Sequence, residues 1–318
     1  MPPCSLASSK QTQTLIKTHG QAKTSDAEPL THHSVSKPFI DKISVTLMLP
    51  SDVREIVSQN LEDALQTPGF FQHARYSATY KHSHLIACEG TAERVLFQFG
   101  RKGCGKSDAR FEFNPHKTGS EGVFGLDYKL RFVFPNGWDD VVQIGRVSRI
   151  DIAVDVPDLT VDDFLYLPAL GLSSERFRRD GHAKTLYFGK RGANQIRIYC
   201  KSDEQAAKGH PMAYSVVRVE QTLVNLKSKV CELSQLPNPL KKMVMTEHCP
   251  VRPGWETSQR WAMFQDCVHA RGLTAALALL PQKRRTDYRK YLAEHQALEW
   301  WNPDEIWKHW PHAVQELL

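Results

Sequence analysis

Apolar and polar residues alternate along several short segments of the chain, which is the pattern of half-buried β-strands. The clearest is residues 149–156, where isoleucine or valine occupies every second position. Residues 43–47 alternate in a similar way. Residues 51–65 instead place apolar side chains at helical spacing behind a capping-type serine, Ser51. We therefore expect the folded part of the chain to begin near Phe39, with a strand followed by a helix.

The same order of elements occurs twice. After the first helix, turn residues separate three strand-like segments, and the second half shows a strand, a short helix and three more strands. Both halves end in an Arg-x-Glu strand. This recurrence predicts an internal duplication of an α+β unit, with chance as the alternative because α+β chains are common. The segments are 80–88, 94–99 and 109–113 in the first half, and 149–156, 160–167 (helix), 184–189, 195–201 and 215–223 in the second.

The predicted fold class is α+β, with two similar strand–helix–three-strand units forming antiparallel sheets, followed by C-terminal helices. Residues 1–37 are rich in Ser, Thr, Gln and Lys and are expected to form a flexible tail. Residues 38–145 form the first unit and residues 146–230 the second. Residues 231–318 are expected to be helical, with amphipathic stretches at 258–280 and 284–298.

Composition narrows the class of protein. The chain has 318 residues, 41% hydrophobic and 24% charged, which fits a soluble globular protein and excludes disordered, collagen-like or coiled-coil chains. It has no apolar run of about 18 residues and no apolar signal-peptide core, so we expect a cytoplasmic protein without membrane contact. None of the seven cysteines forms a CxxC pair, so neither a disulfide framework nor a structural zinc site is indicated.

Alternation also separates the two faces of the second-half strands. The face away from the core collects three carboxylates, which repel one another unless a metal ion or basic side chains compensate. Oxygen ligands of this kind suit Mg²⁺ or Mn²⁺. The alternative is an ordinary solvent face, where mixed charges pair across strands. This face carries Asp151, Asp155, Tyr187, Arg197, Tyr199, Lys201, Arg218 and Glu220.

Four motifs in order carry a resemblance to a known family. They are Ser-Arg-Ile-Asp-Ile-Ala-Val-Asp (148–155), Lys-Thr-Leu-Tyr-Phe-Gly-Lys-Arg (184–191), Ile-Arg-Ile-Tyr-Cys-Lys (196–201) and Val-Arg-Val-Glu (217–220). Over residues 38–230 the chain resembles the replication initiation factor family, which includes rolling-circle initiators of filamentous phages and staphylococcal-type plasmids. Arg-Phe-Glu-Phe-Asn-Pro (110–115) looks like the phage branch. Cys200 departs from the family's usual acidic residue, but it falls on the core face.

The resemblance implies a rolling-circle replication initiator that nicks one strand at an origin. A tyrosine attacks the phosphodiester, forms a 5′-phosphotyrosyl link, frees a 3′-OH primer and later rejoins the strand. By resemblance, Tyr187 is the nucleophile and Lys201 and Arg218 stabilise phosphate charge. Asp151, Asp155 and Glu220 would then hold Mg²⁺ or Mn²⁺. The implied partners are double-stranded origin DNA and the nicked single strand, with host helicase and polymerase and a homodimer as further expectations.

Two competing sites remain open at this point. Tyr199 shares the face of Tyr187 and is the rival nucleophile. In the first half, His82-Ser-His84 approaches the His-x-His pattern of a different class of rolling-circle nickase, but no Tyr-x-x-x-Lys run follows it. We expect a solvated strand there. The first unit, which lacks a Tyr-Phe-Gly equivalent, would be a degenerate partner for DNA binding or dimer contacts.

The formal charge is only +6, but three local clusters concentrate the basic residues. Each is either a solvated face or a source of phosphate contacts. The third cluster lies at 283–290, and we expect the tryptophans at 300–310 to pack rather than to stack on bases. Two other functions stay open: an origin-binding protein that does not cut, and a metal-dependent nuclease that uses water. The residues expected to contact DNA are Arg101, Lys102, Lys106, Arg178, Arg179, Lys190, Arg191 and Arg197.

Overall fold

The computed structural model describes residues 34–103, 107–168, 174–179, 182–247, 251–294, 298 and 300–318, with the backbone alone at 174–179 and 182–184. Residues 32–318 belong to one compact unit. Most of the expected tail therefore lies outside the described residues. Residues 34–37, the last of the expected tail, are described. The backbone N–H of Ser36 donates to the carbonyl of Asp155, and the Ser36 hydroxyl accepts from the Asp155 N–H.

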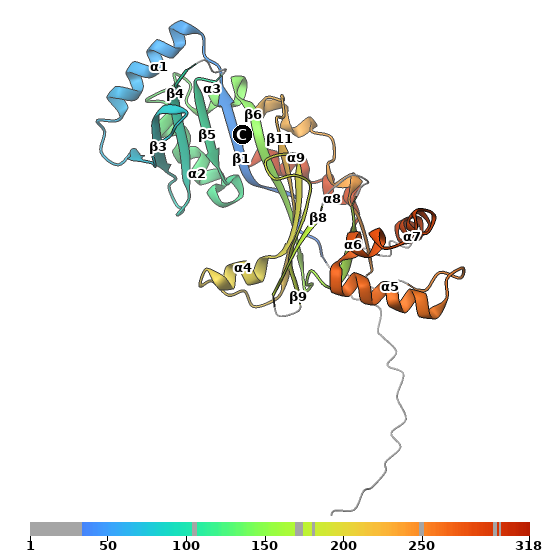
Figure 1. Ribbon diagram of the computed structural model, residues 1–318. Helices are drawn as coiled ribbons and strands as arrows, with labels where there is room; N and C mark the ends of the chain where they lie inside the picture. Colours follow the sequence, from blue (N-terminus) through green and yellow to red (C-terminus); the bar gives the residue numbers. More distant parts are fainter. Residues whose placement is uncertain are drawn as a thin grey trace, which may run out of the picture. The chain divides into compact units, whose positions relative to one another are not determined.

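Within the described residues, ten strands form one antiparallel sheet (Figure 1). Its strand order is β2-β3-β4-β5-β1-β6-β11-β10-β9-β8, so β1 and β6 pair at the centre and each half runs outward in the same order. The two halves expected to form separate sheets thus share one. The strands are β1 (Phe39–Leu47), β2 (Phe71–His73), β3 (Tyr80–Ala87), β4 (Arg94–Arg101), β5 (Ala109–Phe113), β6 (Arg146–Pro157), β8 (Ser174–Arg179), β9 (His182–Phe188), β10 (Gln195–Cys200) and β11 (Val216–Val224).

Of the described helices, α1 to α4 lie between strands of the large sheet in chain order, and α5 to α9 follow in the C-terminal third. Thr257 caps α5, and Gly272, at φ 84°, separates α5 from α6 inside the expected amphipathic stretch 258–280. In the part of the chain that is described, no helix has the length and apolar character needed to cross a membrane. The helices are α1 (Ser51–Ala64), α2 (Pro115–Leu130), α3 (Trp138–Ile144), α4 (Lys201–Ala207), α5 (Ser258–Arg271), α6 (Leu273–Ala278), α7 (Gln282–Glu294), α8 (Pro303–Trp307) and α9 (Trp310–Gln315), with 3₁₀ turns at Val230–Gln235 and Leu240–Lys242.

The helix expected at residues 160–167 is wrong. The chain makes a turn and then a strand, β7 (Phe164–Leu167), which pairs with β12 (Val244–Glu247) in a separate two-stranded sheet. All four residues of β7 are buried, so they form a continuous apolar run without alternation. Such a short run does not distinguish a buried strand from a helix. Because β12 is a strand, the region from residue 231 is not purely helical.

Two hydrophobic cores cover one face of the large sheet. The first lies between α1, α2, α3 and α9 and the strands around β1, and it includes the fully buried Phe97, Phe111 and Trp310. The second packs β6, β10 and β11 against β7, β12 and α8, and it includes Cys200 and Trp301. The expectation that the C-terminal tryptophans pack is confirmed for Trp301 and Trp310, and Cys200 lies on the core side. The opposite face of the sheet remains polar.

The histidine pair of β3 points away from the polar face. Ser83 pairs with Gln98 on the polar side, so His82 and His84 point to the other side, opposite Phe99 and Phe97. His84 is buried, and the expectation of a solvated strand is wrong for it. Burial first, and then the neighbouring His73 and His82, lower the pKa of His84 to about 4. The neutral imidazole is the form that the fold stabilises.

This burial predicts an acid-sensitive step in stability. Above pH 6.5 His84 is neutral in both states, and between pH 6.5 and 4 the unfolded chain binds the proton first. The free energy of unfolding should therefore fall as the pH drops through this window, by about 2 kcal/mol from this group. Urea denaturation of wild type and His84→Leu at pH 7.5 and 4.5 measures it. The fall should be smaller in His84→Leu and unchanged in the exposed control His210→Ala; equal falls in all three would refute this origin.

Candidate active site on the polar face of the sheet

The polar face brings three of the predicted residues into one row across three strands. Tyr187 of β9 pairs directly with Arg197 of β10, which pairs with Glu220 of β11. Directly opposite side chains on one face lie about 4.5–5.5 Å apart at Cβ. The period-two prediction that these three residues share a face is confirmed by the register.

Tyr187 and Arg197 line a pocket of about 460 Å³. Arg149 of β6 and Arg191 of the β9–β10 turn also line it, so three arginines share one pocket with Tyr187. Arg191 is exposed, while Arg197 and Tyr187 are half-buried. Three cations in one concavity attract an anion, and arginine suits phosphate because it presents several donors in a planar fork. The remaining lining residues are Gly192, Ala193, Gln195, Thr222 and Val224.

The turn that forms one wall of this pocket depends on Gly189. This residue has φ 98°, and a Cβ there would lie 2.6 Å from the carbonyl oxygen of Asn194. No larger residue fits that approach without moving backbone. Asn194 also accepts from the backbone N–H of Val224 at 2.9 Å, which ties the turn to β11. The glycine of the Leu-Tyr-Phe-Gly motif thus fixes the turn two residues after Tyr187.

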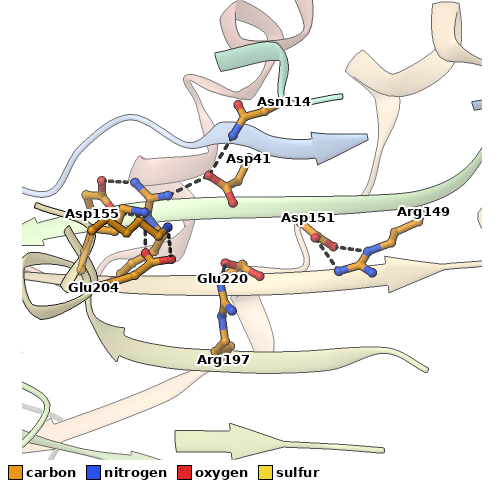
Figure 2. Close-up of polar contacts among 11 residues, drawn as sticks. Asp41, Asn114, Arg149, Asp151, Asp155, Arg197, Glu204 and Glu220 are labelled. Carbon is orange, nitrogen blue, oxygen red and sulfur yellow. Dashed lines mark hydrogen bonds and ion pairs between the residues drawn. The ribbon is translucent and has the colours of Figure 1, made fainter. Parts of the chain in front are cut away.

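Each predicted metal-binding carboxylate is paired with an arginine (Figure 2). Asp151 accepts two hydrogen bonds from Arg149, at 2.9 and 2.7 Å. Glu220 accepts from Arg197 at 2.6 Å. Both carboxylates are buried, so these pairs neutralise charges that burial would otherwise destabilise.

Asp155 forms the third pair, with Arg218, whose Nε and Nη2 reach the two carboxylate oxygens, each at 2.7 Å. The third arm of the same guanidinium donates to Asp41 at 2.7 Å. Its hydrogen bonds to Asp155 raise the pKa of Arg218 although desolvation opposes them. Arg218 is therefore committed to two acids and is buried, which makes it a structural centre of the face.

Asp41 is a member of this cluster that alternation did not predict. A register shift in the β1–β6 ladder lies between Ile40 and Lys42, so Asp41 and Lys42 interrupt the alternation. A bulge of this kind redirects a side chain. Asp41 also accepts a hydrogen bond from Asn114, at 3.3 Å. The only sequence signal is that two adjacent polar residues interrupt an otherwise alternating strand.

Burial raises the pKa of Glu220, with the charges of Asp151 and Asp41 acting in the same direction and Arg197 opposing. The acids therefore lie close enough to disfavour one another's ionised form. Asp41, Asp151, Asp155 and Glu220 outnumber Arg149, Arg197 and Arg218 by one. The face is an interleaved charge network with a small acidic excess, and two of its cations, Arg149 and Arg197, also line the pocket.

The two candidate tyrosines occupy different environments. Tyr199 is buried, and the Arg197 guanidinium lies over its ring, 4.2 Å from the centroid. Burial raises the pKa of Tyr199 well above its ordinary value, which disfavours a phenolate. Tyr187 is half-buried and lines the pocket. The geometry favours Tyr187 as the hydroxyl that a bound phosphodiester would meet.

Lys201 lies outside the pocket. It begins α4, four residues after Arg197, or roughly 13 Å along the chain at strand spacing. Its ammonium pairs with Glu204 at 2.6 Å and lies 5.9 Å from the ring centroid of Tyr199. Although burial opposes the effect, hydrogen bonds from Lys201 and Lys208 lower the pKa of Glu204 to about 2. Lys201 therefore belongs to a separate ion-pair group at the start of α4.

The donor chemistry of Asp151, Asp155 and Glu220 suits a hard divalent cation, but their placement does not form a ready site. In the described parts of the chain, no three His, Cys, Asp or Glu side chains converge as metal ligands. Each of the three predicted ligands is held by an arginine instead. As placed, the residues do not fit a three-carboxylate metal site.

The residues expected to contact DNA separate into three groups. Arg191 and Arg197 line the pocket, and Lys190 is exposed in the same turn. Arg101 and Lys102 lie at the end of β4, where Lys102 donates to the carbonyl of Ser77 at 3.0 Å. Lys106 lies outside the described residues, and for Arg178 and Arg179 only the backbone, in β8, is described. Arg149 is the pocket cation that was not predicted.

The first half of the sheet carries a smaller cluster of polar side chains on the same face. Arg110 of β5 donates to Ser44 at 3.0 Å and pairs with Glu112, which also pairs with Lys42 at 2.7 Å. Although desolvation opposes the shift, the hydrogen bond from Lys42 and the charge of Arg110 lower the pKa of Glu112. In the described part of this half, no tyrosine takes the place that Tyr187 has in the second.

No protein-family model matches the sequence, and no curated protein matches it. Among solved structures, a rolling circle replication initiator protein from Geobacillus stearothermophilus is similar, with a TM-score of 0.37 and 15% sequence identity. The similarity covers 76% of this chain and 99% of that chain. A likeness of this size carries no argument about activity, so a functional assignment depends on this chain's own residues.

Proposed function

We propose that the protein initiates rolling-circle DNA replication by nicking one strand at an origin with Tyr187. The observation that carries this proposal is the pocket that the half-buried Tyr187 lines together with Arg149, Arg191 and Arg197. The order of the motifs around 148–155, 184–191, 196–201 and 217–220 supports it, because it resembles the replication initiation factor family.

In the proposed reaction, the Tyr187 hydroxyl attacks a backbone phosphorus. The P–O bond to tyrosine forms as the P–O3′ bond breaks, and the proton that the phenol loses is balanced by the proton that the released 3′ oxygen gains to become the 3′-OH primer. Negative charge increases on the phosphoryl oxygens during attack, and the arginines of the pocket stabilise it. Attack of a 3′-OH on the phosphotyrosyl bond reverses the step and rejoins the strand.

Glu220 has a positioning role in this scheme. Strand pairing places Arg197 directly opposite Tyr187, and Glu220 accepts a hydrogen bond of 2.6 Å from Nη2 of Arg197. The buried Nε of Arg197 has no hydrogen-bond partner among the described residues. Asp151 holds Arg149 in the same way, through two hydrogen bonds. The carboxylates thus orient the cations that would meet the phosphate.

Mg²⁺ or Mn²⁺ is kept as a proposal on donor chemistry alone: Asp151, Asp155 and Glu220 carry the oxygen ligands that such an ion prefers, but among the described residues they do not converge as its site. A divalent ion would neutralise phosphoryl charge when bound. No step above is routed through it, since the carboxylates are engaged by arginines. Origin DNA and the nicked strand are the proposed partners. Host helicase, host polymerase and a second copy of the chain are further proposed partners.

The experiment incubates the protein with supercoiled DNA that carries the origin of its own replicon. Reactions with Mg²⁺ are compared with reactions that contain EDTA. A nicked circle covalently linked to protein supports the proposal. Nicked circles without any protein adduct would identify a hydrolytic nuclease that uses water. Specific binding without nicking under both conditions would identify an origin-binding protein that does not cut.

A pocket cation that contacts phosphate should leave a signature in the salt dependence of binding. Arg191→Ala removes one exposed guanidinium from the pocket wall, so DNA affinity should fall to a similar extent for all sequences. The slope of log affinity against log salt should decrease by about one. Fluorescence anisotropy at several salt concentrations measures this, with the exposed Lys241→Ala as control. An unchanged slope would remove Arg191 from the phosphate contacts.

A further inference from the structure

A second pocket lies in the C-terminal region, away from the proposed nicking site. It has a volume of about 590 Å³ and is formed by α7 and the segment before α5. Volumes of about 300–1,000 Å³ are typical of small-ligand sites. Two aromatic residues, Trp255 and Tyr291, lie on its wall together with charged residues of α7.

Trp255 offers an aromatic surface that is open to solvent. It is 44% exposed, an unusual state for the largest apolar side chain. Its ring packs edge-on against Tyr288, with centroids 5.3 Å apart, and against Tyr291, with centroids 6.3 Å apart. Those contacts fix the orientation of the indole. A rigid exposed indole is suited to stacking on a planar ring.

Cations lie beside this aromatic surface. The Arg284 guanidinium lies over the Trp255 ring, 5.4 Å from its centroid, and Lys283 and Lys290 line the same pocket. Lys290 lies 3.7 Å from Glu294, an exposed pair that contributes little to stability. An aromatic plane with adjoining cations is the arrangement that binds a base and its neighbouring phosphates.

The pocket also has a half-buried carboxylate, Asp287. An ionised carboxylate only accepts hydrogen bonds, so beside a stacked base it favours an exocyclic amino group. Cytosine and adenine present such a donor, whereas thymine presents a carbonyl oxygen. This group adds a preference among bases to a site that otherwise binds through stacking and charge.

We infer that this pocket binds single-stranded DNA, with one base stacked on Trp255, its phosphates on Lys283, Arg284 and Lys290, and a preference for amino-bearing bases from Asp287. The choice of DNA as ligand rests on the proposed function, which releases a single strand. The pocket itself is built from residues that play no part in the nicking site. It would hold the displaced strand during initiation.

The test is anisotropy of fluorescein-labelled (dC)₁₂ and (dT)₁₂ with the full-length protein carrying Tyr187→Phe, so that no cleavage intervenes. Trp255→Ala should weaken (dC)₁₂ binding about 5- to 100-fold, and Trp255→Phe should restore most of it. The double variant Lys283→Ala/Lys290→Ala should lose more affinity at low salt than at high salt. Phe124→Ala, an exposed aromatic on α2, is the matched control, and circular dichroism confirms folding.

Tighter binding of (dC)₁₂ than (dT)₁₂, lost in Asp287→Asn, supports the inference. Unchanged binding in both Trp255→Ala and the double lysine variant overturns it. So does equal competition by inorganic polyphosphate, because that identifies a general anion site without a base. Nicking is measured separately in the Tyr187-intact protein: failure there concerns the proposed function, whereas failure of oligonucleotide binding concerns only this pocket.

Discussion

Tyr187→Phe should abolish covalent linkage between the protein and DNA and lower nicking by at least about a thousandfold. Phenylalanine keeps the ring and removes only the hydroxyl that would attack phosphorus. Because Tyr187 is half-buried at the pocket wall, the change should leave the fold and DNA affinity nearly unaffected. Gel assays of nicked circles and of protein–DNA adducts, beside circular dichroism and anisotropy, measure each part.

Tyr199→Phe is the matched control for this prediction. Tyr199 lies on the same face, in β10, two residues after Arg197. It is buried, the Arg197 guanidinium lies over its ring, and burial strongly raises its pKa. Nicking by Tyr199→Phe should stay within about tenfold of wild type, since its ring still supports the arginine. The reverse pattern, with adducts retained by Tyr187→Phe and lost in Tyr199→Phe, would transfer the nucleophile to Tyr199.

Arg218→Ala should lower the free energy of unfolding by about 3–5 kcal/mol, because it leaves two carboxylates near the sheet without their cation. Arg218 is 6% exposed and donates to Asp155 twice and to Asp41 once. Few single changes on the polar face remove so many buried contacts. Urea denaturation at pH 7 measures the loss.

Two further variants separate this role from a general effect of mutation. Asp155→Ala should cost less in the Arg218→Ala background than in wild type, since the acid is then unpaired. Lys241→Ala, which breaks an exposed pair with Asp304, should cost no more than about 1 kcal/mol. A loss below about 1 kcal/mol for Arg218→Ala would show that the network does not stabilise the fold.

The sequence predicted the polar face well because strand alternation is a local property. The alternation of β9, β10 and β11 was enough to place Tyr187, Arg197 and Glu220 on one face, and the register then aligned them in a row. The mixed α and β class and the C-terminal helices also follow from local patterns. Strand pairing cannot be predicted in this way. The pairing of β1 with β6 joins both halves in one sheet, and the alternation within β1 or within β6 does not specify it.

The parts that the sequence did not predict have identifiable physical causes. Asp41 reaches Arg218 through an irregularity in β1, and such a shift breaks the alternation on which the prediction depends. Arg149 enters the pocket because β6 lies beside β11, a long-range pairing. The run at Phe164 is apolar throughout, so its strand was mistaken for a helix. The metal-ligand assignment remains a prediction, since the acids are paired with arginines.

The residue that carries the covalent bond to DNA can be identified directly. The protein–DNA adduct formed on supercoiled replicon DNA is digested with nuclease and trypsin, and the peptide that carries the residual nucleotide is identified by mass spectrometry. Cleavage after Lys184 and Lys190 gives the peptide 185–190, which contains Tyr187, and cleavage after Arg197 and Lys201 gives 198–201, which contains Tyr199. We expect the nucleotide on peptide 185–190. A nucleotide on peptide 198–201, or on neither, would contradict it.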